Sequence, residues 1–206
     1  AKSGVPAKMI FRFCKTDLSE WTAIEFVHLQ HFLADALIPT LVNHPRETAV
    51  IVHPNNVSMP VLGRITPYLG ALPLPDDRGA MKHFLEALTW HTDCGDCIMI
   101  YPEAHIWPFY TGIRPFPDTS FRYPVQQKLP VFCLTNTYQR RGKSHIPQIV
   151  TYLDGPFYPD AELPAKLQKT QLRDQVYEAM GKRAQNSNME MIRYIKKDTD
   201  REKSFI

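Results

Sequence analysis

The segment of residues 62–108 constrains the fold of this chain more than any other. Its sequence, LGRITPYLGALPLPDDRGAMKHFLEALTWHTDCGDCIMIYPEAHIWP, predicts a helix end, a short strand after Gly70, an amphipathic helix and then a buried strand. Helices that alternate with strands indicate an α/β domain. The buried strand delivers Glu103 at its carboxyl end, where open α/β sheets place the groups that handle ligands. Several arginines nearby in the sequence suit an anionic ligand.

The rest of the chain continues this alternation, and we predict one α/β domain over residues 1–195, followed by a charged tail at residues 196–206. Its central sheet should be mixed but mostly parallel, with helices on both faces. Strands are expected at residues 8–14, 21–27, 48–52, 72–74, 98–101, 131–137 and 149–153. The strands at 48–52, 98–101 and 131–137 have no polar face, so they should be central.

The helices are recognised by apolar residues that recur at intervals of three and four. They are expected at residues 31–41, 56–68, 76–91 and 161–184, the third of them capped by Asp76 or Asp77. The last helix should pack outside the sheet through an apolar stripe of Leu163, Leu167, Leu172, Val176 and Met180.

The composition excludes some classes of function. The chain has 206 residues, 44% of them hydrophobic, and a net charge of +3, which is too small to indicate nucleic-acid binding. No run approaches about 18 consecutive apolar residues, so no transmembrane helix is predicted. Because the chain begins with Ala1 instead of methionine, we expect a fragment or a processed product, with any membrane anchor outside it.

The four cysteines include the pair Cys94-Gly-Asp-Cys97, whose spacing occurs in metal sites. A structural zinc site needs a second ligand pair, and none has such a spacing, so no metal is expected. Gly95 and Asp96 instead predict a helix end, after which Cys97 opens a buried strand as a small hydrophobic residue. No disulfide framework is indicated, which favours a reducing, cytosolic environment.

Residues 105–123 are rich in aromatic residues and proline and have no periodicity, so we predict a long loop. Loops of this length are usually functional or disordered, and the aromatic content argues against disorder. Two interpretations are open for Trp107, Phe109, Tyr110 and Phe116. These rings contact a membrane interface, or they pack inward as a lid.

His31 and Asp35 form the first candidate catalytic pair. In a helix at residues 31–41 they lie one turn apart on the same face. A carboxylate beside an imidazole fixes its tautomer and stabilises the imidazolium, so the pair can act as a general base that deprotonates an alcohol. A solvated ion pair without a catalytic role is the alternative.

The order of these elements resembles the glycerolipid acyltransferase family, of the lysophosphatidate acyltransferase type, over roughly residues 27–181. The family motif is Asn-His-x-x-x-x-Asp, in which the histidine deprotonates the acceptor hydroxyl and the aspartate orients the histidine. Asp35-Ala-Leu-Ile-Pro fits the continuation of that motif, so the resemblance implies that Asp35 is the orienting residue. Three residues separate His31 from Asp35, and six separate His28 from it. We favour His31 as the base on helix geometry and keep His28 as the alternative.

A second motif of the family, Gly-x-x-Phe-(Ile/Val)-x-Arg, carries the arginine that binds the acceptor phosphate. Residues 70–78 resemble it, with Arg78 two positions late and in the first turn of the following helix. Helix-start amides and a guanidinium together suit a phosphate. The alternative is that Arg78 pairs with Asp76 or Asp77 on the surface. Arg64, in a family-like Leu-Gly-Arg, is a further candidate.

A third motif, Phe-Pro-Glu-Gly-Thr-Arg, is matched at Pro102 and Glu103, but Ala-His-Ile replaces its last three residues. The resemblance therefore implies that Arg114 or Arg122 takes the place of the missing arginine. Glu103 would then pair with one of these arginines or bind the glycerol hydroxyls.

The resemblance implies an enzyme that transfers a fatty acyl group from a thioester donor to the hydroxyl of a lysophospholipid such as 1-acylglycerol 3-phosphate. Acyl-CoA and acyl carrier protein present the same thioester, so the donor stays open. No cofactor and no nucleic acid is expected, and the enzyme would act peripherally at the cytoplasmic face of a membrane. A non-catalytic lipid-binding relative of the same fold is the second interpretation.

Overall fold

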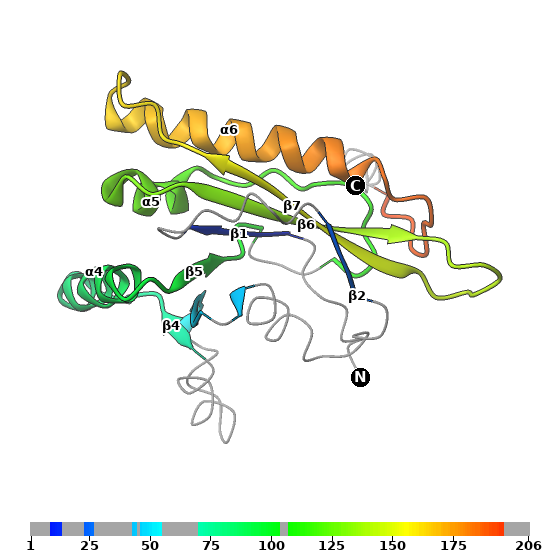
Figure 1. Ribbon diagram of the computed structural model, residues 1–206, viewed down its shortest axis with the longest axis horizontal. Coiled ribbons are helices and arrows are strands. Elements are labelled where there is room, and N and C mark those ends of the chain that lie inside the picture. Colours follow the sequence, from blue (N-terminus) through cyan, green and yellow to red (C-terminus); the bar gives the residue numbers. More distant parts are fainter. Residues whose placement is uncertain are drawn as a thin grey trace, which may run out of the picture.

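The structure is a computed structural model, which describes residues 9–13, 23–26, 43–44, 46–54, 70–103 and 107–195 (Figure 1). Its strands are β1 (Met9–Phe13), β2 (Ala23–Phe26), β3 (Thr48–Val52), β4 (Ala71–Pro73), β5 (Cys97–Ile100), β6 (Val131–Gln139) and β7 (Gln148–Phe157). Its helices are α4 (Arg78–Asp93), the 3-10 helix η2 (Thr119–Phe121), α5 (Arg122–Gln127) and α6 (Ala165–Ala184). Helices packed on a mixed sheet confirm the predicted α/β class. The helices expected at residues 31–41 and 56–68 lie outside the described residues.

The strands form one mixed sheet in the order β2-β7-β6-β1-β5-β3-β4. β3 runs parallel to β4 and β5, and the other four neighbouring pairs are antiparallel. The prediction of mostly parallel pairing is therefore wrong, because β1 runs antiparallel between β5 and β6, and β6 and β7 form a hairpin. β3, β5 and β6 all lie inside the sheet, which confirms the prediction that they are central.

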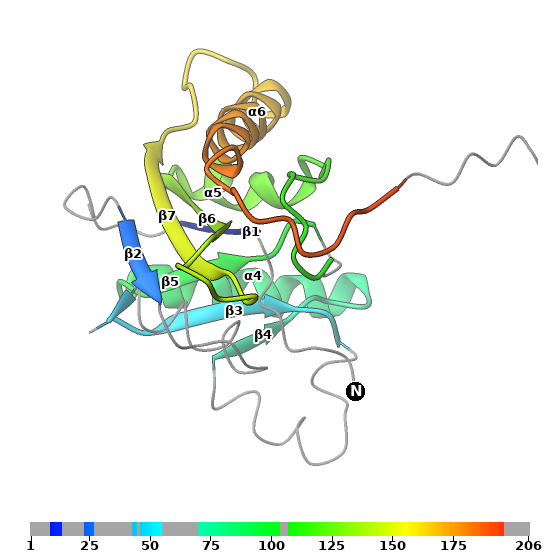
Figure 2. The same cartoon turned by 90° about the vertical axis from the view of Figure 1, so that its right-hand side faces the viewer.

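The internal strands carry an apolar cluster on each face of the sheet. On one face, Ala49, Ile51, Ile98, Ile100 and Val131 share a buried cluster with side chains of α4, α5 and α6. In Figure 2 these helices follow one another alongside the sheet, with α6 at the top. The second cluster, made of alternate residues, consists of Cys97, Met99, Phe132, Leu134 and Leu153. Within the described part of the chain, the predicted helices are thus present on the first face only.

Both boundaries of α4 lie within two residues of the predicted helix at 76–91, and the cap is one of the two predicted residues. Asp77 is the N-cap residue, and its carboxylate accepts a hydrogen bond of 2.7 Å from the backbone N–H of Ala80. The helix ends at Asp93, and Cys97 then opens β5 with a buried side chain. The interpretation of the Cys-Gly-Asp-Cys sequence as a helix end and strand start is therefore confirmed. Among the described residues, no group of three or more histidine, cysteine or acidic side chains is placed to hold a metal ion.

The helix α6 covers β6 and β7 on the first face. Leu172, Val176 and Met180 are fully buried, as the apolar stripe predicts. Leu167, however, is 52% exposed, and the helix starts at Ala165 and not at residue 161. No helix in the described ranges is both long and apolar enough to cross a membrane.

The predicted loop at residues 105–123 ends in helix. Residues 107–118, which we call the aromatic loop, contain no helix or strand, but η2 and α5 follow at once. Pro124 lies in the first turn of α5, where the N–H that proline lacks would have no helical acceptor. The proline is therefore compatible with a helix at this position. Phe116 is buried and packs against Phe121 and Tyr177. Phe116 is therefore unable to contact a membrane interface.

Residues 185–195, which we call the C-terminal strap, return from α6 across the end of β6. The backbone N–H groups of Asn188 and Met189 donate to the carbonyl of Tyr138 at 3.0 and 3.2 Å. The strap then reaches the aromatic loop, where the hydroxyl of Tyr194 donates to the carbonyl of Pro108 at 2.8 Å. Burial raises the pKa of this hydroxyl. The strap thus joins α6, β6 and the aromatic loop.

Asp118 attaches the end of the aromatic loop to α6. Its carboxylate accepts hydrogen bonds from the hydroxyl of Thr170 at 2.7 Å and from the ammonium group of Lys169 at 3.0 Å. These two bonds, the first being the larger cause, hold the pKa of Asp118 below its ordinary value. Because the folded pKa is the lower one, the stabilisation is present above about pH 4 and is lost as the pH falls through the folded pKa.

We therefore expect Asp118→Asn to lower the free energy of unfolding by about 1 kcal/mol near neutral pH. The variant should also lose less stability than the wild type between about pH 5 and pH 3. Urea unfolding at a series of pH values measures both quantities. Identical pH dependence in the two proteins would contradict the assigned role.

Candidate functional site

Two of the predicted site residues lie where the parallel strands end. Arg78, after the carboxyl end of β4, is the first residue of α4. Glu103 lies three residues beyond Ile100, the last residue of β5. β3 separates β4 from β5, so the two strand ends are about 10 Å apart. Arg78 and Glu103 thus share the carboxyl edge of the parallel strands, but no hydrogen bond or ion pair joins them.

The side chain of Arg78 is exposed, and among the described residues it forms no ion pair with Asp76 or Asp77. The surface pairing that the sequence offered as an alternative is therefore not found. The helix start itself is partly occupied, since Asp77 accepts the N–H of Ala80. A phosphate beside α4 would have to bind mainly through the guanidinium of Arg78, because the carboxylate of Asp77 repels a second anion.

Glu103 contacts Arg114, one of the two arginines that the sequence offered as its partner. The contact uses the backbone, because Glu103 Oε1 accepts a hydrogen bond of 2.8 Å from the backbone N–H of Arg114. Both residues are half-buried. The carboxylate therefore fixes the aromatic loop over the carboxyl end of β5 and leaves the guanidinium of Arg114 to point elsewhere.

The guanidinium of Arg114 lies over the ring of Trp107, with Cζ 4.5 Å from the ring centroid. A cation over an aromatic face is attracted by the ring quadrupole. Trp107 is in turn stacked on Tyr194 of the C-terminal strap, with centroids 4.8 Å apart and ring planes at 18°. Tyr110 packs edge-on against both rings. The position of Arg114 thus depends on a chain of contacts that ends in the strap.

Arg122, the other arginine considered for this site, has a structural role. Its guanidinium donates to the hydroxyl of Tyr123 at 2.9 Å and lies 4.8 Å from the centroid of the same ring. It also approaches the sulfur of Met81 in α4 at 3.7 Å. These contacts hold α5 against α4, so Arg114 is the better candidate for binding an anion.

The remaining predicted site residues, His28, His31, Asp35 and Arg64, lie outside the described residues, so their roles stay predictions. Comparison with protein-family models, curated proteins and solved structures finds no match for this chain. The resemblance to the acyltransferase family therefore rests on the sequence motifs and on their order.

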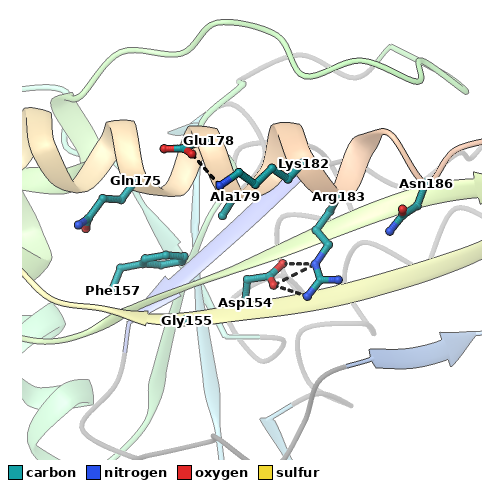
Figure 3. Close-up of a pocket in the computed structure, with 9 residues that line it drawn as sticks. All are labelled: Asp154, Gly155, Phe157, Gln175, Glu178, Ala179, Lys182, Arg183 and Asn186. Carbon is teal, nitrogen blue, oxygen red and sulfur yellow. Dashed lines mark hydrogen bonds and ion pairs between the residues drawn. The ribbon is translucent and has the colours of Figure 1, made fainter.

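A hollow of about 610 Å³ lies between α6 and the end of β7 (Figure 3). Arg183 binds Asp154 there through both Nε and a terminal nitrogen, at 3.0 and 2.6 Å, and this hydrogen-bonded pair raises the pKa of Arg183. Lys182 pairs with Glu178 at 2.7 Å. The sequence did not single out Asp154 or Arg183, although an aspartate within an apolar strand signals a partner. The lining residues are Asp154, Gly155, Phe157, Gln175, Glu178, Ala179, Lys182, Arg183 and Asn186.

This hollow lies beside β7, which is three strands away from β5 in the sheet. Phe157 of β7 is in register with Val131, the first residue of β6. β6 runs in the same direction as β5, because both pair antiparallel with β1. Asp154 pairs with Cys133, which is level with Ile100 of β5 through Phe11 of β1, so the hollow is separated from Glu103 across the sheet and not along the strands. Its charged groups are already paired. The carboxyl edge with Glu103 and Arg114 is the better candidate for a ligand site.

A substitution at Glu103 tests its attachment of the loop. We expect Glu103→Ala to lower the free energy of unfolding by about 1–2 kcal/mol, because the half-buried N–H of Arg114 loses its acceptor. Glu103→Gln keeps an acceptor oxygen and should lose less. Urea unfolding followed by tryptophan fluorescence measures the difference. Equal losses in the two variants would contradict the attachment.

Proposed function

We propose that this protein transfers an acyl group from a thioester donor to the free hydroxyl of a lysophospholipid such as 1-acylglycerol 3-phosphate. The observation that carries the proposal is the grouping of Glu103, Arg114 and Arg78 at the carboxyl edge of the parallel strands. Guanidinium groups bind phosphate through charge-assisted hydrogen bonds, and a carboxylate accepts hydrogen bonds from hydroxyl groups. This set matches an acceptor that carries both groups. An acyltransferase-like α/β domain over residues 1–195 is part of the proposal.

The proposed chemistry places the base on His31, with His28 as the alternative. The imidazole removes the proton from the acceptor hydroxyl while the alkoxide oxygen attacks the thioester carbonyl. Asp35 orients the imidazole and stabilises its protonated form. The tetrahedral intermediate collapses with departure of the thiolate, which takes the proton back from the histidine. An ester and a free thiol are the products, and these steps use only protein residues.

The proposal includes peripheral attachment at the cytoplasmic face of a membrane, since lysophospholipids partition into bilayers. Of the four rings considered for this contact, Phe116 is buried, whereas Trp107 is 40% exposed. The aromatic loop therefore supplies little apolar surface of its own, and the attachment needs other residues.

The test is transfer of a radiolabelled acyl group to a panel of lysolipids, with acyl-CoA or acyl carrier protein as the donor. Release of free thiol is followed in parallel, with protein-only blanks because Cys94 is exposed and reacts with thiol reagents. Arg114→Gln should raise KM for phosphate-bearing acceptors, whereas Lys166→Gln on the exposed side of α6 serves as the matched control.

The second candidate is a non-catalytic lipid-binding protein. The specific observation in its favour is that Ala104, His105 and Ile106 replace the family's Gly-Thr-Arg. Binding of lysolipids without transfer of label and without release of thiol would support it over the enzyme.

A further inference from the structure

The turn between β6 and β7 forms a strongly basic projection. Residues 140–146, which we call the basic tip, are all exposed and include Arg140, Arg141, Lys143 and His145. Among the described residues, none of these four side chains forms an ion pair with an acid. The turn is ordered by its own hydrogen bonds, made by Ser144. The charges are therefore presented on a defined surface.

Apolar side chains are exposed at the same end of the molecule. Ile146, within the basic tip, is 50% exposed. The C-terminal strap runs beside the tip, since the backbone N–H of Arg140 donates to Asn188 Oδ1 at 2.7 Å. Figure 2 shows that the strap starts next to this hairpin and that its last residues run away from the hairpin, past the aromatic loop. In the strap, Ile192 is 42% exposed and Ile195 is 82% exposed.

Unpaired cations beside exposed aliphatic side chains match an anionic bilayer. Cationic side chains near the surface of such a bilayer are attracted by its negative potential, and aliphatic side chains gain from insertion between the headgroups. A nucleic acid would use the cations but would leave Ile146, Ile192 and Ile195 in water. The charge and the apolar surface together therefore favour lipid.

The basic tip lies on the side of the sheet where the candidate site is found. In register through β1, Ile100 at the end of β5 is level with Cys133 of β6. β6 continues for six more residues to Gln139, so the hairpin projects about 20 Å beyond β5. Glu103 and Arg114 follow β5 towards the same side. A bilayer against the tip would therefore face the edge that carries these residues.

We propose that the basic tip and the C-terminal strap dock this protein on the surface of a bilayer that contains anionic phospholipid. This inference deepens the proposed function, because it identifies the surface through which a lipid acceptor is reached. The site of attachment is then the β6–β7 turn and the strap, and the aromatic loop contributes through Trp107 at most.

The test is co-sedimentation of the full chain with two kinds of vesicle. One is pure phosphatidylcholine, and the other contains phosphatidylserine as about one third of its lipid. The charge variant is Arg140→Gln, Arg141→Gln and Lys143→Gln. A matched control removes three lysines from α4 and α6, namely Lys82→Gln, Lys166→Gln and Lys182→Gln. A swap variant, Arg140→Lys, Arg141→Lys and Lys143→Arg, keeps the charge.

We expect the wild type to bind the anionic vesicles preferentially. Because each cation near such a surface contributes about five-fold to the partition coefficient, the charge variant should lose at least about twenty-fold. The control should lose far less, and the swap variant should retain binding. Ile146→Ser with Ile192→Ser should weaken binding at every vesicle charge.

Three results would overturn the proposal. These are absence of wild-type binding to anionic vesicles, an equal loss in the charge variant and the control, and tip-dependent binding to an oligonucleotide without binding to vesicles. Sedimentation needs no acyl transfer, so it separates this proposal from the enzymatic one. Vesicle binding that depends on the tip, in a protein without transferase activity, would leave the docking surface in place and refute only the proposed reaction.

Discussion

Gly70→Ala is expected to destabilise the protein more than any other single substitution considered for this chain. Gly70 has a φ of +77°, and a Cβ atom built on it overlaps the carbonyl oxygen of Thr48. The carbonyl of Gly70 also accepts the N–H of Val50 at 2.7 Å, so the residue cannot move away without breaking the pairing of β3 and β4. We expect a loss of about 4 kcal/mol or more in the free energy of unfolding.

Gly142 in the basic tip provides the matched control. Its φ is +51°, but a Cβ atom there would have no neighbour within 4 Å. Gly142→Ala therefore carries only the cost of a left-handed backbone, about 1 kcal/mol. Chemical unfolding of both variants separates the steric overlap from the backbone strain. Similar losses at the two positions would show that the close approach of Gly70 to β3 is unimportant.

The largest expected effect on activity is at His31. Within the proposed mechanism, His31→Ala removes the general base and should lower kcat by about 100- to 10,000-fold. Asp35→Asn should also lower kcat, because the imidazole then loses the group that fixes its tautomer. His28→Ala should leave kcat close to that of the wild type. Steady-state kinetics with saturating donor measure these changes.

His83→Ala is a suitable control for these substitutions, since His83 lies on the exposed side of α4 with its side chain 82% exposed. If His28→Ala removes activity and His31→Ala does not, the alternative base is the correct one. If neither change lowers kcat, the general-base assignment is wrong.

The elements that local signals determine could be predicted from the sequence. Asp77 caps α4 as expected, and Leu172, Val176 and Met180 of α6 are buried as expected. Strand direction could not be predicted, because pairing depends on contacts between segments far apart in the chain. β1 reads as a strand in isolation, and nothing within its five residues indicates that both of its neighbours are antiparallel.

The candidate site was predictable to a similar extent. The position of Glu103 follows from the apolar strand before it. Arg114, which contacts Glu103, was one of the two arginines considered as its partner. This contact uses the backbone N–H of Arg114 because of the path that the loop takes. No local sequence pattern predicts that path. The stacking of Tyr194 on Trp107 depends on the return of the strap, so no spacing rule could identify it.

The central place of β1 has a consequence for synthesis of the chain. β1 is complete at Phe13, but the two strands that flank it begin at Cys97 and Val131. During translation, both edges of β1 therefore stay unpaired until β5 is complete at Ile100, and one edge stays unpaired until β6 follows. Exposed strand edges promote aggregation, and contacts between distant segments slow folding. An amino-terminal fragment that ends before β6 would leave one edge of β1 unpaired, and we expect it to aggregate more readily than the complete chain.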